Sequence, residues 1–196
     1  LKENIDYLND LAGISKGDIA PDIGEFIENN PKIVSLLRSI KENNLNEIQI
    51  ELDKKKAKYN LDVINSFTEK TGKLLDIGAG PGIFVEVAKK LGWDPTALEF
   101  NKFCVQRLKS LNIDVINLPL EKASIAKESF DLVTIWAVLE HVQDPHMMLK
   151  NSYNILKKGG MLAIRVPNID SLAARIMHEK CTTFAGDAHI NFFNNK

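Results

Sequence analysis

Apolar residues follow two different periods along the chain from Tyr59 onward. Short apolar runs are typical of buried parallel strands. They lie at 74–77, 96–98, 113–117 and 130–136, and a further one begins at Met161. Between these runs, apolar residues recur at helical spacing, which predicts helices at 59–67, 84–91 and 103–111 and after Asp144. Strands that alternate with helices predict an α/β fold with a doubly wound, mostly parallel sheet.

The first part of the chain follows a helical pattern. Pro21 precedes one apolar helix around Phe26, and Asn30-Pro31 opens a second whose apolar stripe runs from Ile33 to Ile40. Between 47 and 52 the apolar residues alternate at period two, while the neighbouring charged residues permit a helix, so both structures stay open.

These patterns predict two domains. We expect an N-terminal helical extension over 1–57 and a second domain over 58–196. The basic run Lys54–Lys58 is interpreted as a solvated helix face. The extension could pack on the second domain or form a contact between two copies of a homodimer.

A glycine-rich segment directly follows the first predicted strand. It reads Asp-Ile-Gly-Ala-Gly-Pro-Gly over 76–82, and the helix predicted after it ends at Gly92. Glycines lack the Cβ atoms that keep a ligand away from the backbone, and the helix that follows presents free amide donors. The segment therefore predicts a loop that cradles a cofactor.

The spacing of these glycines distinguishes between cofactors. A dinucleotide-binding loop has the pattern G-x-G-x-x-G, whereas this chain has G-x-G-x-G followed by Ile83. The missing third glycine counts against a nucleotide-dependent oxidoreductase. About 20 residues further on, the run Thr96-Ala97-Leu98 ends at Glu99, an acid that can accept both ribose hydroxyls.

Composition and charge narrow the possible partners. The chain has 196 residues, of which 44% are hydrophobic, and this is enough for one sizeable core. The formal net charge is -1, so no bulk field favours nucleic acid or an anionic membrane. Cys104 and Cys181 form no C-x-x-C pair, which is typical of a reducing compartment. Without a membrane-spanning stretch or signal peptide, we expect a soluble, cytoplasmic protein.

Four segments resemble, in order, the motifs of class I S-adenosylmethionine-dependent methyltransferases. The glycine segment 76–82 resembles their first motif, and Glu99 aligns with the acid that follows their second strand. The block 130–142 resembles their F-D-x-V strand and E-H signature. The block 155–168 resembles their L-K-P-G-G-x-L turn and the P-N after it, with Lys158 in place of the proline.

This resemblance implies a Rossmann-like methyltransferase fold that binds S-adenosyl-L-methionine. It is strongest for the small-molecule branch, which includes ubiquinone-biosynthesis and sugar-modifying types. A small-molecule methyl acceptor with an O-, C- or N-nucleophile is therefore expected. In this family N-terminal extensions often cover the cofactor or shape the acceptor pocket.

The resemblance also implies roles for individual residues. The loop Gly78–Gly82 would pass beside the methionine and ribose, Asp76 would orient the loop or the bound amino group, and Glu99 would hold the ribose. Leu120 would pack on the adenine, although Pro119 stands where the family commonly has an Asp. The residues expected to bind the cofactor are Asp76, Gly78, Ala79, Gly80, Gly82, Glu99, Phe100, Leu120, Glu121, Trp136 and Ala137.

Methyl transfer from a sulfonium requires few catalytic side chains, because the enzyme chiefly aligns the acceptor with the S–CH₃ bond and excludes water. If the acceptor is a hydroxyl, a general base would help, and His141 and His189 are the candidates. Each could equally be a structural histidine that anchors a loop. The four histidines lack ligand spacing, so no metal site is expected.

Two alternative functions stay open besides the oxidoreductase. A protein or nucleic-acid methyltransferase would favour an N-P-P-Y or D-P-P-Y segment after the strand at 130–136, and Trp136-Ala137-Val138-Leu139 stands there instead. A non-catalytic module would keep the cofactor cradle without turnover.

The C-terminal part carries two further expectations. Asp144-Pro145 opens a helix that includes Ile155 and Leu156 and that Gly159-Gly160 is expected to end. The family's sheet finishes with an antiparallel pair of sixth and seventh strands, and no such pair is visible before Lys196. We therefore expect a sheet that is incomplete at its C-terminal edge.

Overall fold

The computed structural model of the chain describes residues 45–178, 181–184 and 189–194. The chain divides into two compact units, Leu1–Leu52 and Asp53–Lys196. The two helices predicted between Pro21 and Ile40 lie outside the described residues.

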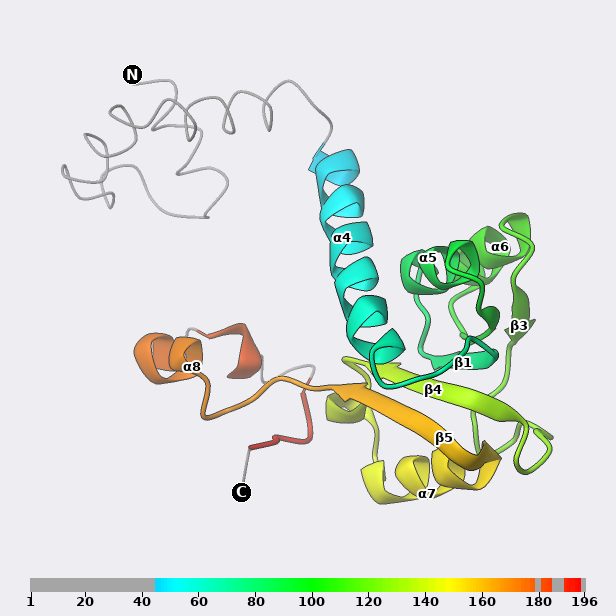
Figure 1. Cartoon of the computed structure of the whole chain (residues 1–196). Helices are drawn as coiled ribbons and strands as arrows, with labels where there is room; N and C mark the ends of the chain where they lie inside the picture. Colours follow the sequence, from blue (N-terminus) through cyan, green and yellow to red (C-terminus); the bar gives the residue numbers. More distant parts are fainter. Residues whose placement is uncertain (1–44, 179–180, 185–188, 195–196) are drawn as a thin grey trace. The chain divides into compact units, whose positions relative to one another are not determined.

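Five parallel strands form one sheet with the order β3-β2-β1-β4-β5 (Figure 1). The strands are β1 Lys73–Ile77, β2 Asp94–Leu98, β3 Asp114–Ile116, β4 Phe130–Trp136 and β5 Leu156–Arg165. The strand order reverses between β1 and β4, and ligands of such sheets bind at this switch point, outside the carboxyl ends of the strands. The predicted α/β class with a doubly wound parallel sheet is confirmed.

Helices connect the strands. They are α4 Leu45–Asn65, α5 Ile83–Lys90, α6 Lys102–Ser110, η1 Leu139–His141, α7 Pro145–Ile155, α8 Leu172–Met177 and η3 Thr182–Phe184. Side chains cap three of the described helices: Asn101 accepts from the amides of Phe103 and Cys104, Asp144 from that of Met147, and Ser171 from that of Ala174. In the described ranges, no helix combines the length and the apolar character that a membrane span requires.

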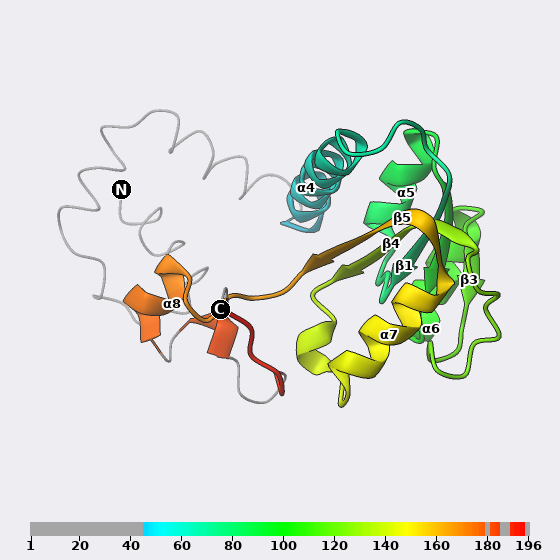
Figure 2. The same ribbon diagram turned by 60° about the horizontal axis from the view of Figure 1, so that its bottom comes forward.

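The central strands bury one set of side chains on each face of the sheet. Leu74 of β1 and Leu132 of β4 pack with the inner residues of α4 and α5. Leu75 and Val133 belong to the cluster on the opposite face, which includes residues of α7. Figure 2 shows α4 and α5 on one side of the sheet and α7 on the other.

This alternation decides where the polar residues of the strands lie. Side chains two positions apart share a face, so Asp76 and Thr134 lie on the face of Leu74 and Leu132. Both are fully buried there, and Trp136 packs against the same cluster. The sheet thus places two buried polar residues on the side that α4 and α5 cover.

The segment with ambiguous period belongs to a helix. α4 runs without interruption from Leu45 to Asn65 and includes both 47–52 and most of the helix predicted at 59–67. Ala57, Leu61 and Ile64 are the residues that it buries in the core. The helix is continuous across the boundary expected between 57 and 58, and the chain's division into two compact units falls between Leu52 and Asp53.

α7 ends earlier than the glycine pair predicted. It stops at Ile155, and β5 begins with the next residue, so Gly159-Gly160 lies inside the strand. The register shifts there, because Phe130 pairs with Leu156 while Leu132 pairs with Met161. The prediction was wrong because glycines permit a bulge as readily as they end a helix; Gly159 has a φ of 77°.

The described residues beyond β5 form short helices and one isolated parallel bridge between Asn168 and Phe193. Within the described ranges, the sheet has no sixth or seventh strand. The segment that carries Phe193 instead returns to the sheet edge near η1, where the amides of Ile190 and Asn191 donate to the Glu140 carbonyl.

Candidate cofactor site

A cavity of about 280 Å³ lies at the carboxyl ends of β1 and β4, on the face that α4 and α5 cover. α4 contributes four residues, the glycine loop and the start of α5 contribute most of the rest, and β4 and β5 contribute one each. The lining residues are Asp53, Lys56, Ala57, Asn60, Asp76, Gly78, Ala79, Gly80, Pro81, Ile83, Phe84, Trp136 and Arg165. The cavity therefore occupies the switch point where this sheet type binds ligands.

The glycine loop turns sharply out of β1. The amide of Gly78 donates to the carbonyl of Leu98 at 2.8 Å, which ties the loop to the end of β2. Gly82 has a φ of 80°, and a Cβ there would clash with Cδ2 of Leu108. Gly80 also has a positive φ, but a Cβ there would meet no atom within 4 Å. Gly82 thus serves close packing, whereas Gly80 borders open space in which a ligand can approach the backbone.

Glu99 connects the loop to the neighbouring strand. Its Oε2 accepts from the amide of Gly80 at 2.6 Å, and its Oε1 accepts from the amides of Phe100 and Asn101 at 2.7 and 2.8 Å. A carboxylate offers about four acceptor positions, so roughly one is left for a further donor. Glu99 does not line the cavity itself, but it holds the glycine loop, whose residues do.

Asp76 is the buried acid of the site, with 1% of its surface exposed. Its Oδ1 accepts from the hydroxyl of Thr134 at 2.6 Å. Burial raises the pKa of Asp76 to about 7, the Thr134 hydrogen bond opposes this rise, and the nearby Glu99 carboxylate adds to it. A cationic ligand group in the cavity would favour the ionised form of this carboxyl.

Trp136 presents an unused donor at the cavity. Its ring packs edge-on against Phe84 with centroids 5.1 Å apart, and the Arg165 guanidinium carbon lies 5.6 Å from the ring centroid. The indole N–H is buried, and no described residue accepts a hydrogen bond from it. Buried donors usually have an acceptor, so this one indicates a ligand that supplies it.

These features fit S-adenosyl-L-methionine. The glycine loop and Glu99 would hold its ribose and methionine part, and Asp76 would face its ammonium group. The unpaired indole N–H of Trp136 and the cations of Lys56 and Arg165 suit an anionic group such as a carboxylate. The residues present are thus compatible with the cofactor that the resemblance implied.

Five of the expected cofactor-binding residues line the cavity, namely Asp76, Gly78, Ala79, Gly80 and Trp136. Gly82 and Ala137 do not line the cavity but lie next to residues that do: Gly82 precedes α5, and the amide of Ala137 donates to the carbonyl of Arg165. Phe100 is 53% exposed outside the cavity. Leu120 and Glu121 border a different hollow between the segment after β3 and α7.

Sequence reasoning missed the contribution of α4 and β5. Asp53, Lys56, Ala57 and Asn60 follow helical spacing and so share one face, which was the available signal. Lys56 lies within the basic run that was interpreted as a solvated face, and it pairs with Asp53 at 3.6 Å. Arg165 carries no local signal, because only the pairing of β5 with β4 brings it beside Trp136.

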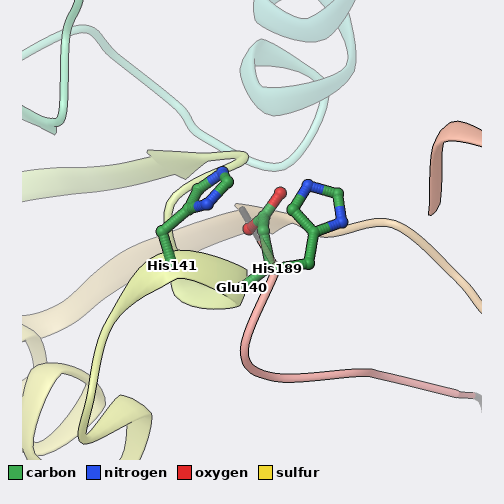
Figure 3. Close-up of side chains that lie close together, drawn as sticks. All are labelled: Glu140, His141 and His189. Carbon is green, nitrogen blue, oxygen red and sulfur yellow. The ribbon is translucent and has the colours of Figure 1, made fainter. Parts of the chain in front are cut away.

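The two candidate base residues lie together at the end of β4. His141 is exposed in η1, His189 is half-buried, and their ring centroids are 4.9 Å apart (Figure 3). Glu140 lies beside both rings. The four histidines lack ligand spacing along the sequence, but the fold brings two of them together with this carboxylate.

Fold and site together define the class of S-adenosylmethionine-dependent methyltransferases. A family model described as a methyltransferase domain matches residues 51–196. The chain therefore belongs to the methyltransferase-domain family, and the family prediction is confirmed. The oxidoreductase alternative is thereby set aside.

Individual relatives agree with this assignment. A ubiquinone biosynthesis O-methyltransferase of Coxiella burnetii is 32% identical over 101 residues, which cover 48% of this chain and 43% of that protein. A ubiquinone biosynthesis O-methyltransferase of Cereibacter sphaeroides is 35% identical over 102 residues, which cover 49% of this chain and 41% of that protein. The matched part thus spans less than half the length of these curated relatives.

Solved structures show the same fold. A possible histamine N-methyltransferase of Thermotoga maritima superimposes with a TM-score of 0.58 at 24% identity, over 77% of this chain and 72% of that one. An S-adenosylmethionine-dependent methyltransferase of Archaeoglobus fulgidus gives a TM-score of 0.59 at 21% identity, over 82% and 68%.

Proposed function

We propose that this protein transfers the methyl group of S-adenosyl-L-methionine to an O-, C- or N-nucleophile of a small molecule by in-line displacement. The observation that carries the proposal is the cavity at the β1–β4 switch point. It combines an open glycine backbone at Gly80, a buried acid at Asp76 and an unpaired indole N–H at Trp136.

The residues of the cavity supply binding and orientation. When bound, S-adenosyl-L-methionine supplies an electrophilic methyl carbon on a sulfonium. Asp76 would hold its ammonium group, and Glu99, which supports the glycine loop, would hold its ribose. Trp136 and Phe84 would form an apolar wall that excludes water. Catalysis then depends mainly on how the acceptor is aligned, which needs no covalent enzyme intermediate.

His141 and His189 are the candidate bases for an acceptor hydroxyl. His141 lies in η1, directly after β4, and His189 lies in the segment that is hydrogen-bonded to η1. Both are at the carboxyl end of β4, as the cavity is. An imidazole can take up the acceptor proton near neutral pH. An acceptor that is already anionic or an unprotonated amine would not need them.

The named relatives support a small-molecule acceptor, because the two curated proteins act in ubiquinone biosynthesis. Two other functions make different predictions. A non-catalytic module would bind the cofactor without turnover, and a protein or nucleic-acid methyltransferase would methylate a macromolecule but no small acceptor.

Calorimetric titration of the full chain tests the cofactor site. S-adenosylmethionine and S-adenosylhomocysteine should bind in the micromolar range, whereas NAD should not bind. Glu99→Ala and the isosteric Glu99→Gln should each weaken binding at least tenfold, about 1.4 kcal/mol, because a ribose acceptor is lost. Glu69→Ala is the matched control, since Glu69 is an exposed acid outside the cavity.

Circular dichroism of each variant separates loss of binding from loss of structure. Failure of both ligands to bind to the folded wild-type chain would refute an active methyltransferase. Binding should be followed by release of S-adenosylhomocysteine with phenolic, amine or carbon-acid acceptors. Binding with no turnover on any small acceptor would favour the module or the macromolecular substrate.

A further inference from the structure

Three potential metal ligands meet beside the sheet edge. Glu140 and His141 belong to η1, directly after β4, and His189 comes from the segment that returns after β5. One ligand atom from each residue lies within 4.8 Å of the other two. In the view of Figure 3, the carboxylate of Glu140 lies between the two imidazole rings.

Backbone contacts hold this arrangement in place. The amides of Ile190 and Asn191 donate to the carbonyl of Glu140 at 2.8 and 3.1 Å. The side-chain amide of Asn191 donates to the carbonyls of Leu139 and Val142 at 3.0 and 2.6 Å. The fold therefore brings His189 to η1 through contacts that do not involve the three side chains themselves.

Glu140 supplies an independent observation. It is 1% exposed, and neither carboxylate oxygen has a hydrogen-bond partner among the described residues. A buried carboxylate is normally paired, hydrogen-bonded or coordinated to a metal ion. A cation bound between this carboxylate and the two imidazoles would supply the partner that its oxygens lack among the described residues.

His189 is oriented for coordination. Its Nδ1 lies 2.9 Å from the carbonyl oxygen of Thr183. A carbonyl only accepts, so Nδ1 carries a proton, and in the neutral ring the lone pair is on Nε2. A backbone carbonyl on the second ring nitrogen is the usual support of a metal-binding histidine.

We propose that Glu140, His141 and His189 bind a divalent transition-metal ion of the Zn²⁺ type. Two imidazole nitrogens with one carboxylate oxygen favour borderline ions such as Zn²⁺ and Co²⁺ over Mg²⁺ or Ca²⁺, which prefer oxygen ligands. Donor atoms around tetrahedral zinc are about 3.3 Å apart, so the three ligand atoms, which lie within 4.8 Å of one another, would need to approach by about an ångström or two when the ion binds.

Such a site does not depend on methyl transfer. A bound ion would occupy the imidazole lone pairs, so His141 and His189 could act as bases for an acceptor hydroxyl only in the metal-free protein. It would clamp the 189–194 segment onto η1, in addition to the backbone bonds. Three protein ligands also leave a position for water or another oxygen ligand.

Metal titration of the cofactor-free full chain tests this proposal, so its outcome is separate from that of the cofactor experiment. The chain is stripped with a chelator and titrated with Zn²⁺, with Co²⁺ as a spectroscopic probe and Mg²⁺ for comparison. We expect one equivalent of Zn²⁺ to bind with micromolar or tighter affinity. Zn²⁺ should also raise the melting temperature, because it binds the folded state, and Co²⁺ should show a visible ligand-field spectrum of nitrogen and oxygen ligands.

Glu140→Gln, His141→Gln and His189→Gln should each weaken Zn²⁺ binding at least tenfold and change the Co²⁺ spectrum. His146→Gln is the control, because His146 is an exposed histidine outside the cluster. If Glu140→Gln fails to fold, the Zn²⁺ affinity of the His141→Gln variant still tests the proposal, because His141 is exposed. Absence of stoichiometric Zn²⁺ binding to the wild-type chain would overturn the proposal, and so would binding that the His141 and His189 variants leave unchanged.

Discussion

The acidic residues at the two ends of the parallel sheet have pKa values shifted in opposite directions. Asp131, near the start of β4, accepts from the Lys73 amide and from the Lys157 ammonium, both at 2.8 Å. Burial alone would raise its pKa, but these two donors lower the pKa overall. Asp76, near the end of β1, accepts from Thr134, and burial raises its pKa to about 7.

Other polar groups follow the same division. Near the carboxyl end of β4, the indole N–H of Trp136 and the carboxylate of Glu140 are buried without hydrogen-bond partners among the described residues. Strained or unsatisfied polar groups concentrate where ligands bind, whereas satisfied ones stabilise the fold. Asp131 is therefore expected to serve stability, and the binding roles proposed for Asp76, Trp136 and Glu140 are consistent with this difference.

Of the three substitutions, Asp76→Asn should change the unfolding free energy most. The folded state keeps the Asp76 proton up to about pH 7, whereas the unfolded chain releases it near pH 4. The folded state therefore binds more protons between these values, and the wild-type stability due to Asp76 falls as pH rises through this window. Asparagine can still accept from Thr134 but does not ionise, so the variant should gain up to about 4 kcal/mol relative to wild type by pH 8.

Urea unfolding of both proteins at pH 5, 6, 7 and 8 measures this difference, because other titrating groups cancel in the comparison. The same variant should bind S-adenosylhomocysteine at least tenfold more weakly, since the ammonium loses its carboxylate partner. Parallel stability curves with unchanged affinity would show that Asp76 does not differ from Asp131 in the way described.

Asp131→Ala should change the unfolding free energy less than Asp76→Asn does, and it should lower this free energy instead of raising it. The variant loses two charge-assisted hydrogen bonds that join β1, β4 and β5, so we expect a loss of about 2 kcal/mol of unfolding free energy. Affinity for S-adenosylhomocysteine should stay within twofold, because Asp131 does not line the cavity. A large loss of affinity in a still folded variant would break the distinction between the two sheet ends.

Trp136→Phe should have the smallest effect on stability. Phenylalanine keeps an aromatic ring beside Phe84 and Arg165 but removes the unpaired N–H. The unfolding free energy should therefore change by less than about 1 kcal/mol, while cofactor affinity falls several-fold. Calorimetry of the same preparation gives both values, and an affinity equal to that of wild type would show that the indole N–H does not contact the cofactor.

Local patterns predicted a large part of this molecule. The pattern of apolar residues predicted the α/β class, and four short motifs in order, from the glycine loop to the block 155–168, predicted the family, because each motif depends on residues that are close in sequence. The end of α7 was misjudged, since Gly159-Gly160 is compatible with both a helix end and a bulge, and only the pairing of β5 with β4 selects the bulge. Leu120 and Glu121 were assigned by their position after β3, yet they border another hollow.

The sequence by itself thus determined the strands, the cofactor loop and the acid that supports it, since backbone preference and side-chain period act over a few residues. Only the tertiary structure decided which distant residues share a site. α4 brings Lys56 and Asn60 to the glycine loop, and β5 brings Arg165 to Trp136. The returning segment brings His189 to Glu140 through hydrogen bonds to a backbone carbonyl, a contact that no residue pattern along the chain specifies.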